Sequence, residues 1–147
     1  MKVLVIHGPN LDALGSRQPE IYGSETLADI DAAVTAEATR HEAALDIHQT
    51  AREGEIIELL HAAQVDGALV NPGAYAHTSR AIADAFASVA YPVVEVHLSN
   101  IHAREEWRHT SVTAASAAGV VTGFGGRSYV VGLQALMHLI QEGRDGP

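Results

Sequence analysis

The 147-residue sequence contains no cysteine, and its only lysine is Lys2 at the chain start. Without cysteine, the chain can form no disulfide, thiolate nucleophile or thiolate metal site. This composition is compatible with a reducing, cytoplasmic location, which we expect. The sequence also lacks an apolar run of the ~20 residues that a membrane-spanning helix needs. The apolar segment at residues 2–6 ends too soon for a secretory signal, so we interpret it as a buried strand.

Positive charge is scarce as well. Nine Lys and Arg residues stand against eighteen Asp and Glu residues, which gives a formal net charge of −9. This charge disfavours nucleic acids and anionic membranes as partners, and we expect neither. An anionic substrate must therefore be captured by a local positive site. Hydrophobic residues make up 47% of the chain, which predicts one folded domain with a single core.

Apolar, β-branched runs alternate with helical patterns along the chain. The predicted strands are residues 2–6, 45–49, 67–70, 93–97 and 119–122. The predicted helices are residues 26–41, 52–63, 79–88 and 127–142. Thr26 is expected to cap the first helix, with Asp29 in an imperfect capping box. This alternation predicts one α/β domain over residues 1–147 with a frayed tail at 143–147. Its sheet should be parallel, five-stranded and flavodoxin-like, in the order 2-1-3-4-5, with helices on both faces.

Ligands of such sheets bind at the carboxyl ends of the strands, near the point where strand order reverses. The most polar and glycine-rich junctions of this chain follow its first, third and fourth predicted strands. They are residues 7–15, 71–79 and 95–100. Because these strands are neighbours in the predicted order, we expect their loops to converge on one crevice.

Several common occupants of this fold are disfavoured by the residues at these junctions. Residues 8–15 contain no Ser or Thr for a flavin phosphate, and Asn71 stands where a phospho-receiver needs Asp. The glycines at 123, 125 and 126 follow the last strand and miss dinucleotide spacing, so we interpret them as a tight turn. None of the nine histidines forms a His-Glu-x-x-His pair, so we expect no metal site.

Two pairs of residues are candidates for acid–base chemistry. Glu95 and His97 are two apart in a strand and should project to the same face, where a carboxylate would favour the protonated imidazole of a general acid. A structural His–Glu pair is the alternative. Arg17 and Tyr22 lie in a segment with glycine at both ends and a central proline, which we interpret as a mobile loop and a candidate lid. A nearby guanidinium would favour a tyrosinate base, whereas an ordinary exposed loop is the alternative.

Further polar groups follow the third and fourth strands. Gly73 permits close backbone approach, and Asn71 and His77 flank it. Ser79 is a candidate helix cap. Leu98 and Ser99 could offer backbone N–H groups to a carboxylate. Arg104 and Arg108 could share one face of a short helix, or form surface ion pairs with Glu105 or Glu106. Together these groups suit proton abstraction beside a carbonyl with loss of water.

Five motifs in order carry a resemblance to a known family. They are Gly-Pro-Asn-Leu from residue 8, Leu-Gly-x-Arg-x-Pro-x-x-Tyr-Gly from 14, Asn-Pro-Gly-Ala-x-x-His-Thr-Ser from 71, Glu-Val-His-Leu-Ser-Asn from 95 and Arg-Glu-Glu-Trp-Arg from 104. In sequence and spacing they resemble the type II 3-dehydroquinate dehydratases, over residues 3 to about 139. The resemblance implies a flavodoxin-like hydro-lyase that converts 3-dehydroquinate to 3-dehydroshikimate by anti elimination through an enolate.

The resemblance also implies roles for individual residues. Tyr22 would remove the proton beside the ketone, with Arg17 holding it as phenolate. Asn10 would help stabilise the enolate through a water molecule. His97, oriented by Glu95, would protonate the departing hydroxyl. The substrate-binding residues would be Asn71, Gly73, His77, Leu98, Ser99 and Arg108.

No cofactor, metal or Schiff base is implied, and Lys2 is the only lysine that could form a Schiff base. The family assembles as a dodecamer of trimers in which an Asp from a neighbouring subunit completes the site. Asp84 matches that Asp. The pathway stays open between aromatic amino acid biosynthesis and quinate catabolism.

The sequence departs from the family pattern at a few positions. The family usually has Asn at the position of His7, often Asn at Asp12, and a polar residue at Ala51. Arg80 and Ala83 replace an apolar–basic pair near Asp84. Two other functions are weighed: a non-catalytic sensor of a cyclic hydroxy acid, which would require loss of key catalytic residues, and a lyase for another cyclic β-hydroxy ketone, which the retained substrate-binding residues disfavour.

Overall fold

A computed structural model of the chain describes residues 1–16, 18–22 and 24–146, with the exception of the Tyr22 side chain. Its centre is a parallel sheet made of β1 (Lys2–His7), β2 (Ala44–Gln49), β3 (Gly67–Asn71), β4 (Val93–His97) and β5 (Gly119–Thr122). The strand order β2-β1-β3-β4-β5 confirms the predicted flavodoxin-like sheet. The register pairs His7 with Asn71, so the carboxyl ends of β1 and β3 lie side by side.

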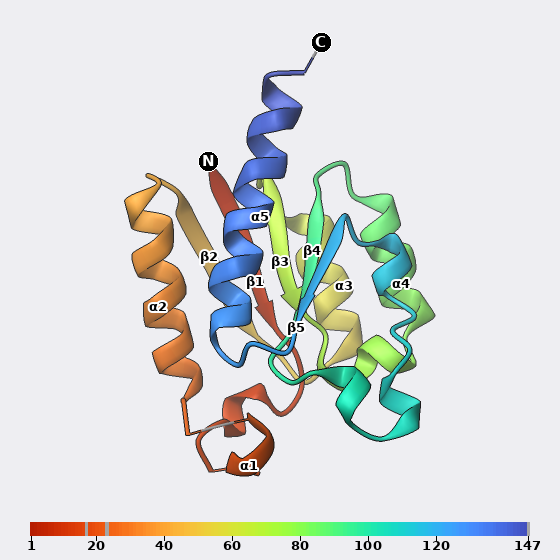
Figure 1. Cartoon of the computed structure of the whole chain (residues 1–147). Coiled ribbons are helices and arrows are strands. Elements are labelled where there is room, and N and C mark those ends of the chain that lie inside the picture. Colours follow the sequence, from red (N-terminus) through yellow and green to blue (C-terminus); the bar gives the residue numbers. More distant parts are fainter. Residues whose placement is uncertain (17, 23, 147) are drawn as a thin grey trace.

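Helices cover both faces of the sheet (Figure 1). They are α2 (Leu27–Arg40), α3 (Glu53–Ala62), α4 (Arg80–Ser88) and α5 (Arg127–Arg144), whereas the short helix α1 (Pro19–Tyr22) lies at the edge where the strands end. Helices α2 and α5 pack together on one face, and α3 and α4 pack together on the other. The strands β1, β3 and β4 are therefore almost entirely buried, which explains their continuous apolar runs.

The expected helices and strands are all present, with ends that differ by at most two residues. Helix α5 continues to Arg144, two residues beyond its expected end, and Arg144 forms an ion pair of 2.7 Å with Asp66. The short helix α1 lies within the segment that was predicted as a loop, so that part of the prediction was incomplete.

Two hydrophobic clusters hold the helices to the sheet. The cluster on the α2 and α5 side includes Val5, Ile30, Leu69, Val96 and Leu133. The cluster on the α3 and α4 side includes Ile6, Ile56, Val70, Ile82 and Phe86. Alternate residues of one strand, such as Val5 and Ile6, thus point into different clusters, which fixes the strand orientation.

Side-chain caps fix where two of the helices begin. Thr26 Oγ1 accepts from the Asp29 N–H at 3.1 Å, and Asp29 Oδ2 accepts from the Thr26 N–H at 3.0 Å. The capping box that was expected to be imperfect is therefore complete, because Asp reaches back as Glu does. Ser79 Oγ accepts from the Ile82 N–H at 3.0 Å, which confirms Ser79 as the cap of α4.

All five strands point toward one edge of the sheet, where the loops after β1, β3 and β4 gather beside α1 (Figure 1). The chain start and the end of α5 lie at the opposite edge. Among the described residues, no helix combines the length and apolarity required to cross a bilayer.

Candidate active site

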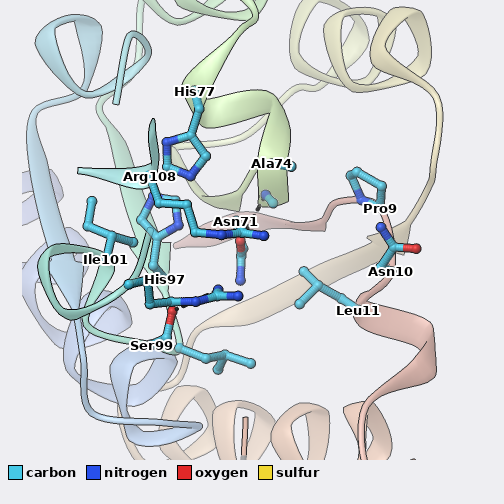
Figure 2. A pocket seen from close by; sticks show the side chains of 13 residues that line it. Pro9, Asn10, Leu11, Asn71, Ala74, His77, His97, Ser99, Ile101 and Arg108 are labelled. Atoms are coloured by element: carbon cyan, nitrogen blue, oxygen red, sulfur yellow. Dashed lines mark hydrogen bonds between the residues drawn. The ribbon is translucent and has the colours of Figure 1, made fainter. Parts of the chain in front are cut away.

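A cleft opens at the carboxyl edge of the sheet, between the loops that follow β1, β3 and β4. It is lined by Pro9, Asn10, Leu11, Asn71, Gly73, Ala74, His77, His97, Leu98, Ser99, Ile101, Arg104 and Arg108. Figure 2 shows His77, His97 and Arg108 on one side, Pro9, Asn10 and Leu11 on the other, and Asn71 between them. The predicted convergence of the three junctions is confirmed.

Glycine at position 8 allows the β1 loop to approach the end of β3. The Gly8 N–H donates to the Asn71 carbonyl at 2.8 Å. A Cβ on Gly8 would lie 2.7 Å from that carbonyl oxygen and from the Pro72 carbonyl carbon, closer than atoms can pack. The next turn places Asn10 at φ 70°, a left-handed conformation that Asn tolerates better than most residues. This geometry brings Asn10 to the cleft.

The buried side chain of Asn71 forms the floor of the cleft. Its Oδ1 accepts from the Gly73 N–H at 3.0 Å. Gly73 itself has φ +60°, and a Cβ there would meet the Pro9 carbonyl oxygen at 3.1 Å. The glycine thus permits both the turn and the close contact with the β1 loop.

The expected contact between Glu95 and His97 is present. The His97 Nε2–H donates to Glu95 Oε1 at 2.6 Å, and both side chains are buried. Ser111 Oγ donates to Glu95 Oε1 at 2.7 Å, and Thr113 Oγ1 donates to Oε2 at 2.6 Å. Burial by itself would raise the pKa of Glu95, but the bonds from His97, Thr113 and Ser111 outweigh it and lower the pKa. Glu95 is therefore a buried carboxylate.

The other ring nitrogen of His97, Nδ1, is available to a ligand in the cleft. In the part of the chain that the structure describes, His97 Nδ1 has no hydrogen-bond partner. Because Nε2 is engaged by the carboxylate, Nδ1 is the atom through which His97 can exchange a proton with a ligand. The cleft thus holds an imidazole whose orientation is set by Glu95.

His77 lies beside His97, with 6.2 Å between the ring centroids. Its Nδ1–H donates to the Thr110 carbonyl at 2.9 Å, and its ring lies perpendicular to that of Trp107, with 5.4 Å between the ring centroids. Partial burial lowers the pKa of His77, with His97 and Arg108 adding to this effect. A neutral His77 retains Nε2 as a hydrogen-bond acceptor, which suits a ligand hydroxyl.

Two arginines, Arg104 and Arg108, supply positive charge at the cleft of this acidic chain. Arg108 Nε donates to Glu105 Oε2 at 2.6 Å, and its guanidinium lies 4.0 Å from the Trp107 ring centroid. Arg104 Nη1 donates to Ser99 Oγ at 3.3 Å. Both side chains are largely buried at the cleft. Arg108 therefore belongs to the site as well as to the surface ion pair that was the alternative.

The prediction that both arginines share one short helix was wrong. Residues Ile101–Ala103 and Glu106–Arg108 form two separate 3-10 turns, and Arg104 is the extended residue that ends the first. The intervening Arg104 backbone breaks the helical spacing, so the two guanidinium groups approach the cleft from different turns.

Leu98 and Ser99 follow β4 directly and line the cleft as expected. Together with Arg104 they also border a second hollow, whose other wall includes Glu20 and Ile21 of α1. The predicted lid segment thus lies next to the cleft. Arg17 and the side chain of Tyr22 lie outside the described residues.

Asp84 lies on the exposed face of α4 and does not line the cleft of its own chain. Among the departures, His7 is fully buried behind the cleft, and Asp12 is exposed. Ala51 contributes its carbonyl, which accepts from the Tyr75 hydroxyl at 2.9 Å. A backbone group therefore makes a polar contact at the position where a polar side chain was missing.

Sequence reasoning missed Ser111 and Thr113, which bind the Glu95 carboxylate. The two hydroxyl residues are separated by one position in the bend that precedes the Ala114–Ser116 turn, and both face the same carboxylate. Nothing in the local pattern connects them to a strand 16 residues earlier in the chain. Ile101, which lines the cleft with an apolar side chain, also gave no signal.

Within residues 1–16, 18–22 and 24–146, no three His, Asp or Glu side chains converge in a way that could hold a metal ion. The cleft instead combines an imidazole–carboxylate pair, arginines and an oriented amide. Such an arrangement can bind a carboxylate or hydroxyl groups and transfer a proton to a leaving oxygen.

Comparison with known proteins places these features in a family. A family model described as dehydroquinase class II matches residues 1–137. The 3-dehydroquinate dehydratase of Desulforudis audaxviator is 51% identical over 98% of this chain and 97% of its own length. That of a Synechococcus strain is 52% identical over 93% of this chain and 95% of its own.

Solved structures agree with this likeness. The type II dehydroquinase from Butyrivibrio crossotus has a TM-score of 0.91 and 40% identity, covering 93% of this chain and 97% of that one. The architecture is therefore shared along with the sequence. By the family model, the sequence identity and the fold together, this chain belongs to the class II dehydroquinase family.

Proposed function

We propose that this chain is a hydro-lyase that dehydrates 3-dehydroquinate to 3-dehydroshikimate. Family membership and relatives named 3-dehydroquinate dehydratase support the reaction. The observation that carries it is the buried Glu95–His97 pair, which faces a cleft that also contains Arg108 and Asn71. An acid next to groups that bind a hydroxylated carboxylate is what loss of water from this substrate requires.

The first step is removal of a proton from the carbon beside the ketone. We assign the removal of this proton to Tyr22, which acts as a phenolate base. Arg17 stabilises the negative charge on the Tyr22 oxygen. The electron pair of the broken C–H bond moves onto the ketone oxygen and forms an enolate. Asn10 faces the cleft from the β1 loop and would stabilise that oxygen through a water molecule.

The second step is loss of the tertiary hydroxyl. His97 donates its proton to this oxygen as the carbon–oxygen bond breaks, so that water leaves. The enolate electrons form the new carbon–carbon double bond and restore the ketone. Glu95 stabilises the protonated imidazole and orients it through the bond at Nε2, which leaves Nδ1 as the donating atom. The proton and the hydroxyl group leave from opposite faces of the ring, as in an anti elimination.

Substrate binding is assigned to the remaining cleft residues. Asn71 and the backbone of Leu98 and Ser99 would hold the carboxylate, and Gly73 lets the β3 loop approach it. His77 and Arg108 would bind ring hydroxyls, because neutral His77 offers an acceptor and Arg108 offers donors. No metal or organic cofactor is needed for these steps.

An assembly is part of the proposal. Asp84 is exposed on α4, away from the cleft of its own chain, and would complete the site of a neighbouring subunit. We propose a homododecamer built from trimers, located in the cytoplasm. The same dehydration would serve either aromatic amino acid biosynthesis or quinate catabolism.

The direct test is ultraviolet absorbance after mixing the purified protein with 3-dehydroquinate, because the product is a conjugated enone. We expect a rise in absorbance that survives chelator and borohydride treatment. Tyr22→Phe and His97→Ala should abolish most of the rise in absorbance and leave substrate binding intact. The control His61→Ala, at an exposed helix position, should give the same rise as the wild type. A folded wild-type protein that gives no rise, or full turnover in either cleft variant, would contradict the proposal.

A further inference from the structure

A buried histidine lies directly behind the cleft, and the proposed reaction does not use it. His7 ends β1, and its side chain is fully buried between α2 and α5. Its Nε2 lies 2.7 Å from Oδ1 of Asp31 on α2, and its Nδ1 lies 2.8 Å from the hydroxyl of Tyr129 on α5. A single imidazole thus joins two helices to the first strand.

The protons in this chain of contacts can be placed. Tyr129 is fully buried, and burial raises its pKa far above the ordinary value, so its hydroxyl keeps its proton. Burial lowers the pKa of His7, and Asp31 opposes this only in part. A neutral His7 has one donor and one acceptor. Nε2–H donates to the Asp31 carboxylate, and Nδ1 therefore accepts from the Tyr129 O–H.

Tyr129 extends the chain of contacts to the floor of the cleft. His7 and Asn71 are partners across β1 and β3, and the Asn71 side chain lies beside the Tyr129 hydroxyl, where it lowers the pKa of Tyr129 as an N–H donor does. The other end of that amide, Oδ1, accepts from the Gly73 N–H at 3.0 Å. Reversing the Asn71 amide would place its N–H₂ against the Gly73 N–H and its oxygen against the Tyr129 oxygen. Both contacts would be lost.

We propose that His7, anchored by Asp31, is a positioning residue for substrate binding: through Tyr129 it fixes which end of the Asn71 amide points into the cleft. The inference rests on the proposed role of Asn71 in holding the substrate carboxylate. With this orientation the amide offers N–H to an anion, whereas the reversed amide would present oxygen and repel it. His7 would therefore affect binding from a position that the substrate never touches.

Two substitutions at position 7 test the contacts of the two imidazole nitrogens separately. In His7→Asn the amide reaches the place of Nδ1 and can still accept from Tyr129, but the contact with Asp31 is lost. In His7→Gln the amide reaches the place of Nε2 and can still donate to Asp31, but the contact with Tyr129 is lost. Tyr129→Phe removes the same contact from the other side and keeps the ring.

We expect His7→Gln and Tyr129→Phe to raise KM for 3-dehydroquinate about 5- to 10-fold, the size expected for one hydrogen bond. The kcat should stay within about twofold, because the carboxylate is bound equally in the ground and transition states. His7→Asn should keep KM near the wild-type value. Combining His7→Gln with Tyr129→Phe should add little, because both remove one contact. His61→Gln at an exposed position is the matched control.

Three results would overturn the inference. One is an unchanged KM in His7→Gln and Tyr129→Phe with only a lower melting temperature, which would make the contact purely structural. Another is an equal rise in KM for His7→Asn and His7→Gln. The third is a crystal structure of His7→Gln in which the Asn71 amide keeps its contact with Gly73 in a single orientation. That structure tests the inference even if wild-type turnover is absent, a result that would contradict the proposed function instead.

Discussion

Replacing Glu95 by glutamine would test the central acid–base pair with little change of shape. Glu95 has no solvent exposure, and its carboxylate receives hydrogen bonds from His97, Ser111 and Thr113. The amide oxygen of Glu95→Gln can still accept from His97, and the two hydroxyls can rotate to accept from the amide N–H₂. The variant should therefore fold, while the negative charge beside the imidazole is gone.

The size of the effect follows from that charge. A hydrogen bond to a charged group contributes about 1.5–3 kcal/mol, compared with about 1 kcal/mol for a neutral bond. If His97 carries its proton in the reactive state, losing the carboxylate should lower kcat about 10- to 100-fold. The KM should change less, because Glu95 contacts no substrate atom in the proposed mechanism.

The assay is initial-rate absorbance of the enone product, with Glu58→Gln on the exposed face of α3 as the control. Thr113→Val, which removes one donor to the carboxylate but keeps the charge, should lower kcat less than Glu95→Gln does. Full kcat in Glu95→Gln would refute the reasoning, since the pair would then be structural. So would an equal loss in Glu58→Gln.

The same pair should appear in the pH dependence of stability. The pKa of Glu95 in the folded protein is below its ordinary value of 4.5. Its contribution to stability is therefore fully present above about pH 4.5 and is lost as the pH falls through the folded pKa. Chemical denaturation from pH 7 to 3 should show a wild-type advantage over Glu95→Gln that shrinks below pH 4.5. A difference that does not depend on pH would contradict the assignment.

Three further predictions concern other parts of the site. Gly8→Ala should destabilise the fold by about 1–3 kcal/mol, because its methyl group would meet backbone atoms at 2.7 Å. At the exposed helix position Gly54, an added Cβ meets nothing within 4 Å, so Gly54→Ala should stabilise the fold by up to about 1 kcal/mol. Denaturation midpoints equal to that of the wild type would contradict both predictions. Coexpressing Asp84→Asn with His97→Ala should restore about a quarter of the sites if Asp84 acts across a cyclic interface, and none if it acts within its own chain. Arg108→Lys should raise KM about tenfold by steady-state kinetics, because the planar fork and the stacking on the indole are lost, and an unchanged KM would exclude Arg108 from binding.

Much of the fold could be predicted because the signals are local. Buried runs such as residues 67–70 and 93–97 read as strands of a two-sided sheet, and the caps at Thr26 and Ser79 are encoded within three residues of the helix start. Strand order was predicted from the number of strands, because 2-1-3-4-5 is a common order for a doubly wound parallel sheet of five strands. Helix α1 was missed because four residues carry too little periodic pattern to be distinguished from a turn.

In the candidate site, too, the contacts that depend on local patterns could be predicted. The contact between Glu95 and His97 could be predicted because alternate residues of a strand share a face, and the carboxyl-end rule placed the three loops together. Arg104 and Arg108 were expected on one helix, but a four-residue spacing has that meaning only if the backbone is helical throughout, and here it is not.

The sequence by itself determined the family, the sheet and the residues that meet at its carboxyl edge. These depend on periodicity, on glycine and on motifs that lie within single loops. Only the tertiary structure decided that Ser111 and Thr113 hold Glu95, and that His7 lies between Asp31 and Tyr129. Those contacts join residues that are 16 to 122 positions apart in the chain. Hydrogen bonds across such separations depend on how helices pack on the sheet, and local sequence patterns carry no record of that packing.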